Sequence, residues 1–301
     1  MKFANLGKIS VSTAAVACAF AVAAPQAEAG VLHNGWNYSI DSFSDGSGGE
    51  VYDYKGLAAY DAGDQFIFAI SGGLNFDENS GKNLTHGDLF LNFSGEDFDV
   101  ANGSSSMLAI KFAPNDTDFE TGLYTGVTGG DINDFANINH TGHYSSLKNY
   151  YNKGFDKENT YGTDLATSDA VYDYFYSDAV AANPKDGNTP FMSAMQSGTK
   201  IGDVSMLTKS VLNSQYGLDF AHFDAVGSDV FGIAIDKALL GTVLPGGING
   251  FMAHLILECG NDGVALAGAL EIPTEEEVPE PTALAALALV GVGMLGARKR
   301  R

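Results

Sequence analysis

His140 and His143 form an H-x-x-H pair, a spacing at which histidine side chains can ligate zinc. A zinc protease also needs a glutamate within the motif and a helix to carry it, whereas Asn137 and Gly142 indicate a loop here. The chain contains no G-x-S-x-G turn and no glycine-rich phosphate-binding loop. We therefore predict no metal ligand, no catalytic residue and no enzymatic activity.

Short acidic clusters are the other candidates for metal binding, because calcium prefers oxygen ligands. A loop beginning at Asp41 would place Phe43 where an EF-hand requires an oxygen ligand, and Tyr52 where it requires a glutamate. Asp and Gly also favour turns, so turns are our interpretation, no cofactor is expected, and calcium is kept as a minor alternative. The clusters are Asp41 with Asp45, Asp116 with Asp118, and Asp131 with Asn133 and Asp134.

Tyrosines are concentrated in one segment, since seven of the 13 lie within 144–176. A tyrosine ring has a flat apolar face and a polar tip, which suits stacking on sugar rings as well as protein contacts. A helix that buried Tyr172, Phe175 and Tyr176 would leave Tyr174 facing water. The possible ligand-binding residues are Tyr150, Tyr151, Tyr161 and Tyr174. Ordinary packing of the segment on a sheet is the interpretation that we prefer.

The elements that must position these residues are mostly short strands. Gly, Asn, Asp and Ser separate short apolar runs, and in FGIAID and LAIKF the apolar residues alternate as half-buried strands require. Hairpins are expected across 61–64 and 260–263, and the run QFIFAIS, apolar on both faces, predicts a central strand. We predict a mainly β fold, a β-sandwich of jelly-roll or lectin-like type with short helical insertions.

Two segments have helical spacing. The first, 163–182, has Thr163 or Asp164 as a candidate cap and is followed by Pro184. The second, 208–216, ends at Gly217. Both are predicted as helical excursions from the β scaffold.

Charge restricts the partners of the chain. Between Gly30 and Val278, ten lysines and no arginine accompany 35 acidic residues, a formal net charge of −25. Phosphate binding is supplied by Lys and Arg, so nucleic acid is excluded as a partner. Cys259 is the one cysteine of this region, so no internal disulfide is possible there, and we expect a buried small apolar residue.

The N-terminal 29 residues have the three parts of a secretory signal peptide. Lys2 and Lys8 precede an apolar run over 9–24, and Ala27-Glu28-Ala29 provides a small-residue cleavage site. Cleavage after Ala29 would make Gly30 the first residue of the exported chain. A permanent N-terminal anchor is the less favoured interpretation, because of that site.

The C-terminal region changes character twice. The segment 271–278 is rich in Glu and Pro and predicts a solvated linker. An uncharged run over 282–297 would span about 24 Å as a helix, against a hydrocarbon core of about 30 Å, so it is a short transmembrane segment. The cluster Arg298-Lys299-Arg300-Arg301 is expected on the cytoplasmic side. Pro279-Glu280-Pro281 then lies outside the membrane in extended form, as proteases require.

This order of Pro-Glu-Pro, apolar run and basic cluster resembles the PEP-CTERM sorting signal. The resemblance implies processing by an exosortase, a membrane-embedded cysteine protease or transpeptidase of Gram-negative bacteria. The implied partners are the exosortase, the general secretion machinery and, transiently, the inner membrane. Three further stretches resemble exosortase-dependent surface proteins of cyanobacterial type: WNYSIDSFSDGSGG (36–49), GDLFLNFSGEDF (87–98) and LECGNDGVALAG (257–268).

The sequence thus predicts a signal peptide (1–29), a β-sandwich ectodomain (30–270), a linker (271–278) and a sorting signal (279–301). The expected function is that of a noncatalytic exported protein, first inserted in the membrane and then located at the cell surface or in the extracellular matrix. A carbohydrate-binding module that recognises exopolysaccharide is the alternative. A secreted hydrolase is a more distant one.

Overall fold

The computed structural model describes residues 30–41, 49–76, 85–113, 117–132, 146–152, 164–184, 187–244 and 250–268. The predicted signal peptide, linker and sorting signal, with the apolar run 282–297, lie outside these residues. Within the described part of the chain, no helix is long and apolar enough to cross a membrane.

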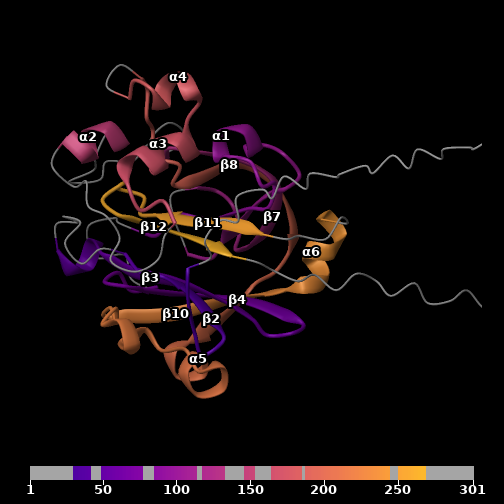
Figure 1. The fold of residues 1–301 in the computed structure, drawn as a ribbon. Helices are drawn as coiled ribbons and strands as arrows, with labels where there is room; N and C mark the ends of the chain where they lie inside the picture. Colours follow the sequence, from indigo (N-terminus) through magenta and orange to yellow (C-terminus); the bar gives the residue numbers. More distant parts are fainter. Residues whose placement is uncertain are drawn as a thin grey trace, which may run out of the picture.

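Two antiparallel sheets make up the scaffold (Figure 1). In each, a meander of four consecutive strands is extended by two strands from the C-terminal part of the chain. The first sheet has the order β1 (Val31–His33), β2 (Trp36–Ser39), β3 (Tyr54–Asp61), β4 (Gln65–Gly72), β10 (Asp229–Asp236), β9 (Ser205–Thr208). The second has the order β12 (Gly263–Gly268), β11 (Phe251–Ile256), β5 (Leu89–Asn92), β6 (Met107–Lys111), β7 (Gly122–Gly130), β8 (Ala194–Gly202).

The mainly β fold and both predicted hairpins are confirmed. β3 pairs with β4 across 61–64, and β11 pairs with β12 across the turn that contains Gly260. Strand β4, which holds the QFIFAIS run, is central because it pairs with β3 on one side and β10 on the other. The finer assignment to a jelly-roll or lectin-like type stays a prediction.

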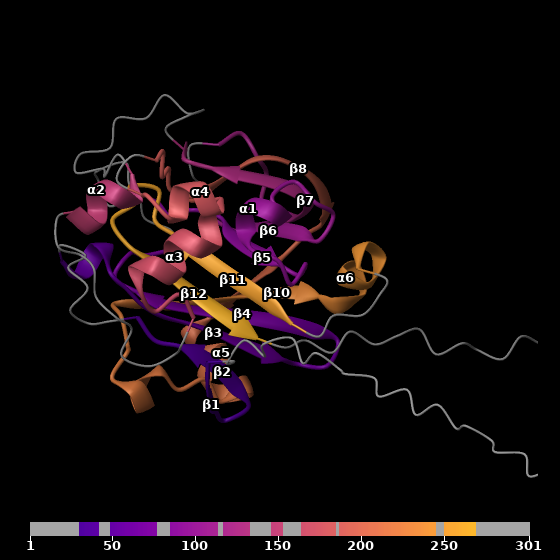
Figure 2. The same ribbon diagram turned by 45° about the horizontal axis from the view of Figure 1, so that its top comes forward.

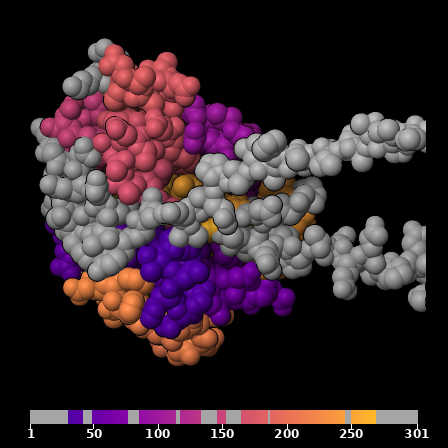
Figure 3. Space-filling view, in the orientation of Figure 1, coloured from indigo at the N-terminus to yellow at the C-terminus, as the bar shows by residue number. Residues whose placement is uncertain are grey.

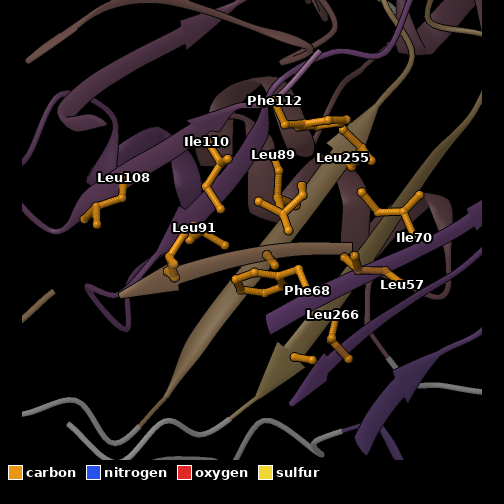
Figure 4. Close-up of a cluster of buried hydrophobic side chains, with 14 of the residues drawn as sticks. Leu57, Phe68, Ile70, Leu89, Leu91, Leu108, Ile110, Phe112, Leu255 and Leu266 are labelled. Carbon is orange, nitrogen blue, oxygen red and sulfur yellow. The ribbon is translucent and has the colours of Figure 1, made fainter. Parts of the chain in front are cut away.

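The main core lies between the two sheets. Alternate residues of β4, such as Phe68 and Ile70, belong to one buried cluster with Leu89 and Leu91 of β5 and with Leu255 of β11. Figure 4 shows these side chains meeting from the two sides. The alternation predicted for FGIAID and LAIKF is confirmed: Phe231, Ile233 and Ile235 and, in the other sheet, Leu108, Ile110 and Phe112 belong to this cluster.

Each sheet has an outer face that is covered by helices (Figures 1 and 2). Over the first sheet lie α5 (Lys209–Tyr216) and the short helix η3 (Phe220–Phe223). Over the second lie four helices: α1 (Phe98–Ala101), α2 (Leu147–Asn152), α3 (Ser168–Phe175) and α4 (Asp178–Ala181). In the space-filling view α2 to α4 form a lobe on the side opposite the N-terminal strands (Figure 3). Two further helices connect strands, η1 (Glu50–Tyr52) before β3 and α6 (Lys237–Val243) after β10.

The two helix predictions have different outcomes. Helix α5 is confirmed, with the Thr208 side chain accepting a hydrogen bond from the Val211 N–H and Gly217 in the left-handed region at φ 67°. The single helix over 163–182 is wrong. Helix α3 begins at Ser168 with Thr167 as its cap, and the chain becomes extended at Tyr176 before α4. The Tyr176 hydroxyl donates to the Pro190 carbonyl (2.6 Å), and this contact accompanies the break between the helices.

Candidate functional site

A cavity of about 90 Å³ lies between the outer face of the second sheet and the tyrosine-bearing helices. Its floor is formed by β11 and β12, and its walls by α2, α3 and the turn at Asp164. We call it the insertion pocket and define it by six of its lining residues, Asp41, Tyr150, Tyr151, Asp164, His254 and Asp262.

The floor of the pocket follows from strand alternation. In β12, Val264 and Leu266 point into the core between the sheets. Gly263 and Ala265 therefore face the helices, opposite Ile256 and His254 of the paired strand. Because glycine and alanine are small, they leave space beneath α2 and α3 that larger side chains would fill.

Three carboxylates of the described part of the chain line this pocket, and all are buried: Asp41, Asp164 and Asp262. Asp262 accepts a hydrogen bond from its neighbour, the Gly263 N–H (2.9 Å), and another from the Tyr54 N–H, which joins the hairpin turn to the first sheet. Burial raises the pKa of Asp164 to about 7, and a hydrogen bond from the Ala267 backbone partly offsets that rise. Among the described residues that line the pocket, none is a lysine or an arginine.

A second acidic group adjoins the pocket at Asp41 and Asp262. One carboxylate oxygen each of Asp41, Asp53 and Asp262 lies within 4.8 Å of the others. Calcium binds oxygen at about 2.3–2.6 Å, so oxygens on opposite sides of the ion are about 4.6–5.2 Å apart, and the trio could hold a divalent cation. Part of its charge is already balanced, because the Lys55 Nζ lies 2.8 Å from Asp53 Oδ2.

His254 is the buried nitrogen base of the pocket. Its Nε2 lies 3.1 Å from the Met192 carbonyl oxygen, so this nitrogen carries the proton and donates. Its Nδ1 is then an acceptor, and it has no hydrogen-bond partner among the described residues. The ring stacks on Phe90 with centroids 4.8 Å apart. Burial lowers the pKa of His254 to about 3, so the ring is neutral near pH 7.

The structure brings two of the four predicted tyrosines into the pocket. Tyr150 is buried and Tyr151 is half-buried, and their rings meet edge to face with centroids 5.5 Å apart. The expectation that Tyr174 faces water is wrong, because only 5% of it is exposed. It packs against Phe98 of α1, a helix that the sequence did not predict, and its hydroxyl accepts from Asn92 Nδ2 at 3.4 Å. Tyr161 lies outside the described residues.

The other predicted residues are dispersed or lie outside the described part of the chain. Gly30 is described and lies beside Asn37. Asp131 is buried and accepts from the Phe191 N–H. Cys259 is confirmed as a buried residue, and burial raises the pKa of its thiol to about 12. Outside the described residues lie Asp45, Asp116, Asn133, Asp134, His140, His143, Ala27, Ala29, Pro279, Glu280, Pro281, Arg298, Lys299, Arg300 and Arg301.

Asp53 and Asp262 are the site residues that sequence reasoning missed. They are far apart in the chain, and they meet because the β11–β12 turn reaches the start of β3. No local spacing could have shown this. Asp41 was singled out, but as a partner of Asp45.

A family model described as the PEP-CTERM protein-sorting motif matches residues 277–301. The chain carries a PEP-CTERM sorting motif. The motif indicates exosortase-dependent sorting at the membrane toward the cell surface, with an exosortase as processing partner. No curated protein sequence and no solved structure matches the chain. The resemblance to cyanobacterial surface proteins stays a prediction.

Proposed function

We propose that the protein is a noncatalytic component of the cell surface or extracellular matrix of a Gram-negative bacterium. The observation that carries the proposal is the PEP-CTERM motif at 277–301, joined through an acidic linker to a folded β ectodomain. The signal peptide delivers the chain to the secretion machinery. The inner membrane then holds the precursor until the exosortase cuts it.

Three buried side chains among the described residues, Cys259, His86 and His254, are held in unreactive states, which supports a noncatalytic role. Burial raises the pKa of Cys259 to about 12, so little nucleophilic thiolate is present near pH 7. Burial also lowers the pKa of His86 to about 4, against a smaller opposing effect of Asp229, and that of His254 to about 3. Neither histidine is poised to exchange a proton near neutral pH.

Both ends of the described ectodomain lie next to the side chain of Asn37. This arrangement suits a precursor that is attached to the membrane at both ends. Asn37 Nδ2 donates to the Ala267 carbonyl (2.8 Å), one residue before the end of β12. Gly30, the predicted first residue after cleavage, lies beside the same asparagine. The folded domain can therefore form while both terminal segments approach the membrane from one side.

The intact mass of the protein recovered from its native host tests the sorting proposal. We expect a chain that begins at Gly30 and ends between Val278 and Pro281. A stable surface form that extends through Arg301 would contradict processing of the tail.

Carbohydrate binding is a second candidate function, favoured by the insertion pocket. Tyr150 and Tyr151 offer ring faces, while Asp41, Asp164 and Asp262 offer acceptors for sugar hydroxyls. A glycan array that includes the host's own polysaccharide tests it. Tyr151→Ala should reduce binding, whereas Tyr216→Ala, on the half-buried tyrosine that ends α5 over the other sheet, should not. Failure to bind any glycan would exclude this candidate. Release of reducing ends would instead support the hydrolase alternative, for which Asp164 could serve as the general acid.

A further inference from the structure

Only one end of the Asn37 side-chain amide is hydrogen-bonded among the described residues. The residue is 9% exposed, and its Nδ2 donates to the Ala267 carbonyl (2.8 Å), which fixes the orientation of the amide. Its Oδ1 is buried and has no hydrogen-bond partner in the described part of the chain. Buried acceptors are nearly always paired in folded proteins, because one left without a donor is costly. Asn37 Oδ1 therefore marks a place that a donor would fill.

Gly30, the first residue of the exported chain if the signal peptide is cut after Ala29, lies beside this acceptor. A side-chain carbon on Gly30 would lie 3.0 Å from Asn37 Oδ1 and 2.1 Å from the Tyr38 carbonyl oxygen. The pairing of Val31 with Tyr38 holds the start of β1 in this place. Because 2.1 Å is far shorter than a carbon–oxygen contact, only glycine fits at position 30 without a shift of the backbone.

Removal of the signal peptide changes what Gly30 offers to these acceptors. In the precursor its nitrogen belongs to the peptide bond with Ala29 and carries one N–H. In the exported chain the nitrogen is an ammonium group, with three N–H donors and a positive charge. It is also a terminal group, so rotation about the Cα–C bond of Gly30 moves it toward the position that a side-chain carbon would occupy. A rotation that stops short of that position brings the nitrogen close to both Asn37 Oδ1 and the Tyr38 carbonyl.

From this geometry we propose that Asn37 Oδ1 and the Tyr38 carbonyl bind the ammonium group that signal-peptide removal creates on Gly30. We call this pair of acceptors the N-terminal seat. The inference rests on the signal-peptide cleavage that the proposed function includes. Asn37 then holds both ends of the ectodomain, because the same amide accepts from Gly30 and donates to Ala267 near the end of β12. Hydrogen bonds from a charged donor are stronger than neutral ones, so cleavage stabilises the fold where the sorting linker leaves it.

Thermal unfolding of the exported chain, residues 30–278, tests the N-terminal seat. The chain that begins at Gly30 should have the highest Tm. Retaining Ala29 moves the ammonium group one residue away without changing the net charge, and should lower Tm by about 3–6 °C, as loss of one charge-assisted hydrogen bond predicts for a domain of this size. Gly30→Ala should lower Tm by a similar amount, because its methyl group meets the Tyr38 carbonyl.

Asn37→Ala provides the matched control, because it removes the side-chain acceptor of the seat. Retention of Ala29 should lower the Tm of this variant by less than half as much, which is the coupling expected of two groups in contact. An equal decrease with and without Asn37 would show that the extra residue acts elsewhere and would overturn the seat.

A second measurement needs no variant. An aldehyde that is selective for N-terminal amines should modify Gly30 at least about tenfold more slowly in the folded chain than in urea, because a hydrogen bond to a charged group must first break. Equal rates would overturn the seat.

The intact mass of the protein from its native host separates this inference from the function on which it rests. If the mature chain begins at Gly30 but its Tm is insensitive to Ala29, the seat is wrong and the sorting proposal stands. If the mature chain begins elsewhere, the cleavage assignment is wrong and the seat falls with it.

Discussion

The outer layers of the two sheets are built alike but filled differently. Over the first sheet, Trp36 stacks on Tyr60 with ring centroids 5.0 Å apart, and its indole N–H donates to the Tyr216 carbonyl (2.7 Å). Over the second sheet, Gly263 and Ala265 form part of the floor, and the helices border a cavity lined by three buried carboxylates of the described residues. One layer is closed by a large aromatic side chain. The other retains space and buried charge.

This difference indicates that the layer over the first sheet serves packing, whereas the layer over the second sheet is suited to binding. Closing a sheet face with apolar rings lowers the free energy of the fold. Burying carboxylates beside a cavity raises it unless each charge is hydrogen-bonded, neutralised or met by a ligand. The layer over the second sheet combines a cavity with polar side chains and aromatic rings, and this is why we place the proposed binding function there.

The largest expected effect comes from removing the Trp36 side chain from the closed layer, by which we mean the layer over the first sheet. Trp36→Ala should lower the free energy of unfolding by about 3–5 kcal/mol, because a fully buried indole leaves a large cavity and an unmatched carbonyl. Tyr151→Ala, which opens a layer that is already hollow, should cost about 1 kcal/mol. Urea unfolding followed by circular dichroism measures both. Equal costs would show that the layers do not differ in packing.

The buried charge of the open layer should appear in the pH dependence of stability. Because the pKa of Asp164 is about 7 when folded and 3.8 in the reference state, the folded chain holds a proton that the unfolded chain releases. The stabilisation that the proton on Asp164 gives the folded chain is fully present below about pH 4. It is lost as the pH rises toward about 7, and the total loss in the free energy of unfolding is up to about 4 kcal/mol. Asp164→Asn should flatten the stability curve in this window, whereas the exposed Asp169→Asn should not. Unfolding midpoints measured across this pH range test the prediction. An unchanged dependence of stability on pH in Asp164→Asn would contradict the raised pKa of Asp164.

The closed layer and the main core were largely predictable, because their signals are local. Alternation in FGIAID and LAIKF identified core-facing residues, and Thr208 with Gly217 marked both ends of α5. Each pattern repeats within a few residues of sequence. Strand and helix geometry then decides which side chains are buried.

For the open layer, by which we mean the layer over the second sheet, the sequence predicted only the concentration of tyrosines and not how they pack. The tyrosine cluster was visible in the sequence, but the burial of Tyr174 depends on α1, a four-residue helix that lies earlier in the chain. The meeting of Asp41 with Asp53 and Asp262 depends on sheet order. Such contacts come from tertiary packing, which overrides local propensity and leaves no trace in residue spacing.

A matched pair of enlargements compares the space in the two layers directly. Ala58 of β3 faces the closed layer and is fully buried, while Ala265 of β12 lines the insertion pocket. Ala58→Met should cost about 1–3 kcal/mol, because the added atoms have no room. Ala265→Met should cost less than about 1 kcal/mol, since its side chain can occupy the cavity, and it should also block ligand entry. Thermal unfolding measures the change in stability, and the glycan array measures the loss of binding. If Ala265→Met destabilised the fold as much as Ala58→Met, the cavity could not accommodate new atoms.

The smallest expected difference concerns the caps of the two covering helices. The Thr167 side chain accepts from the Ala170 N–H at the start of α3, and Thr208 accepts from the Val211 N–H at the start of α5. Alanine at either position should cost about 1 kcal/mol in global stability. Helix α3 also forms a wall of the insertion pocket, so only Thr167→Ala should weaken glycan binding as well. Parallel urea unfolding and titration of the two variants separate these effects, and equal loss of binding in both would mean that α3 does not shape the pocket.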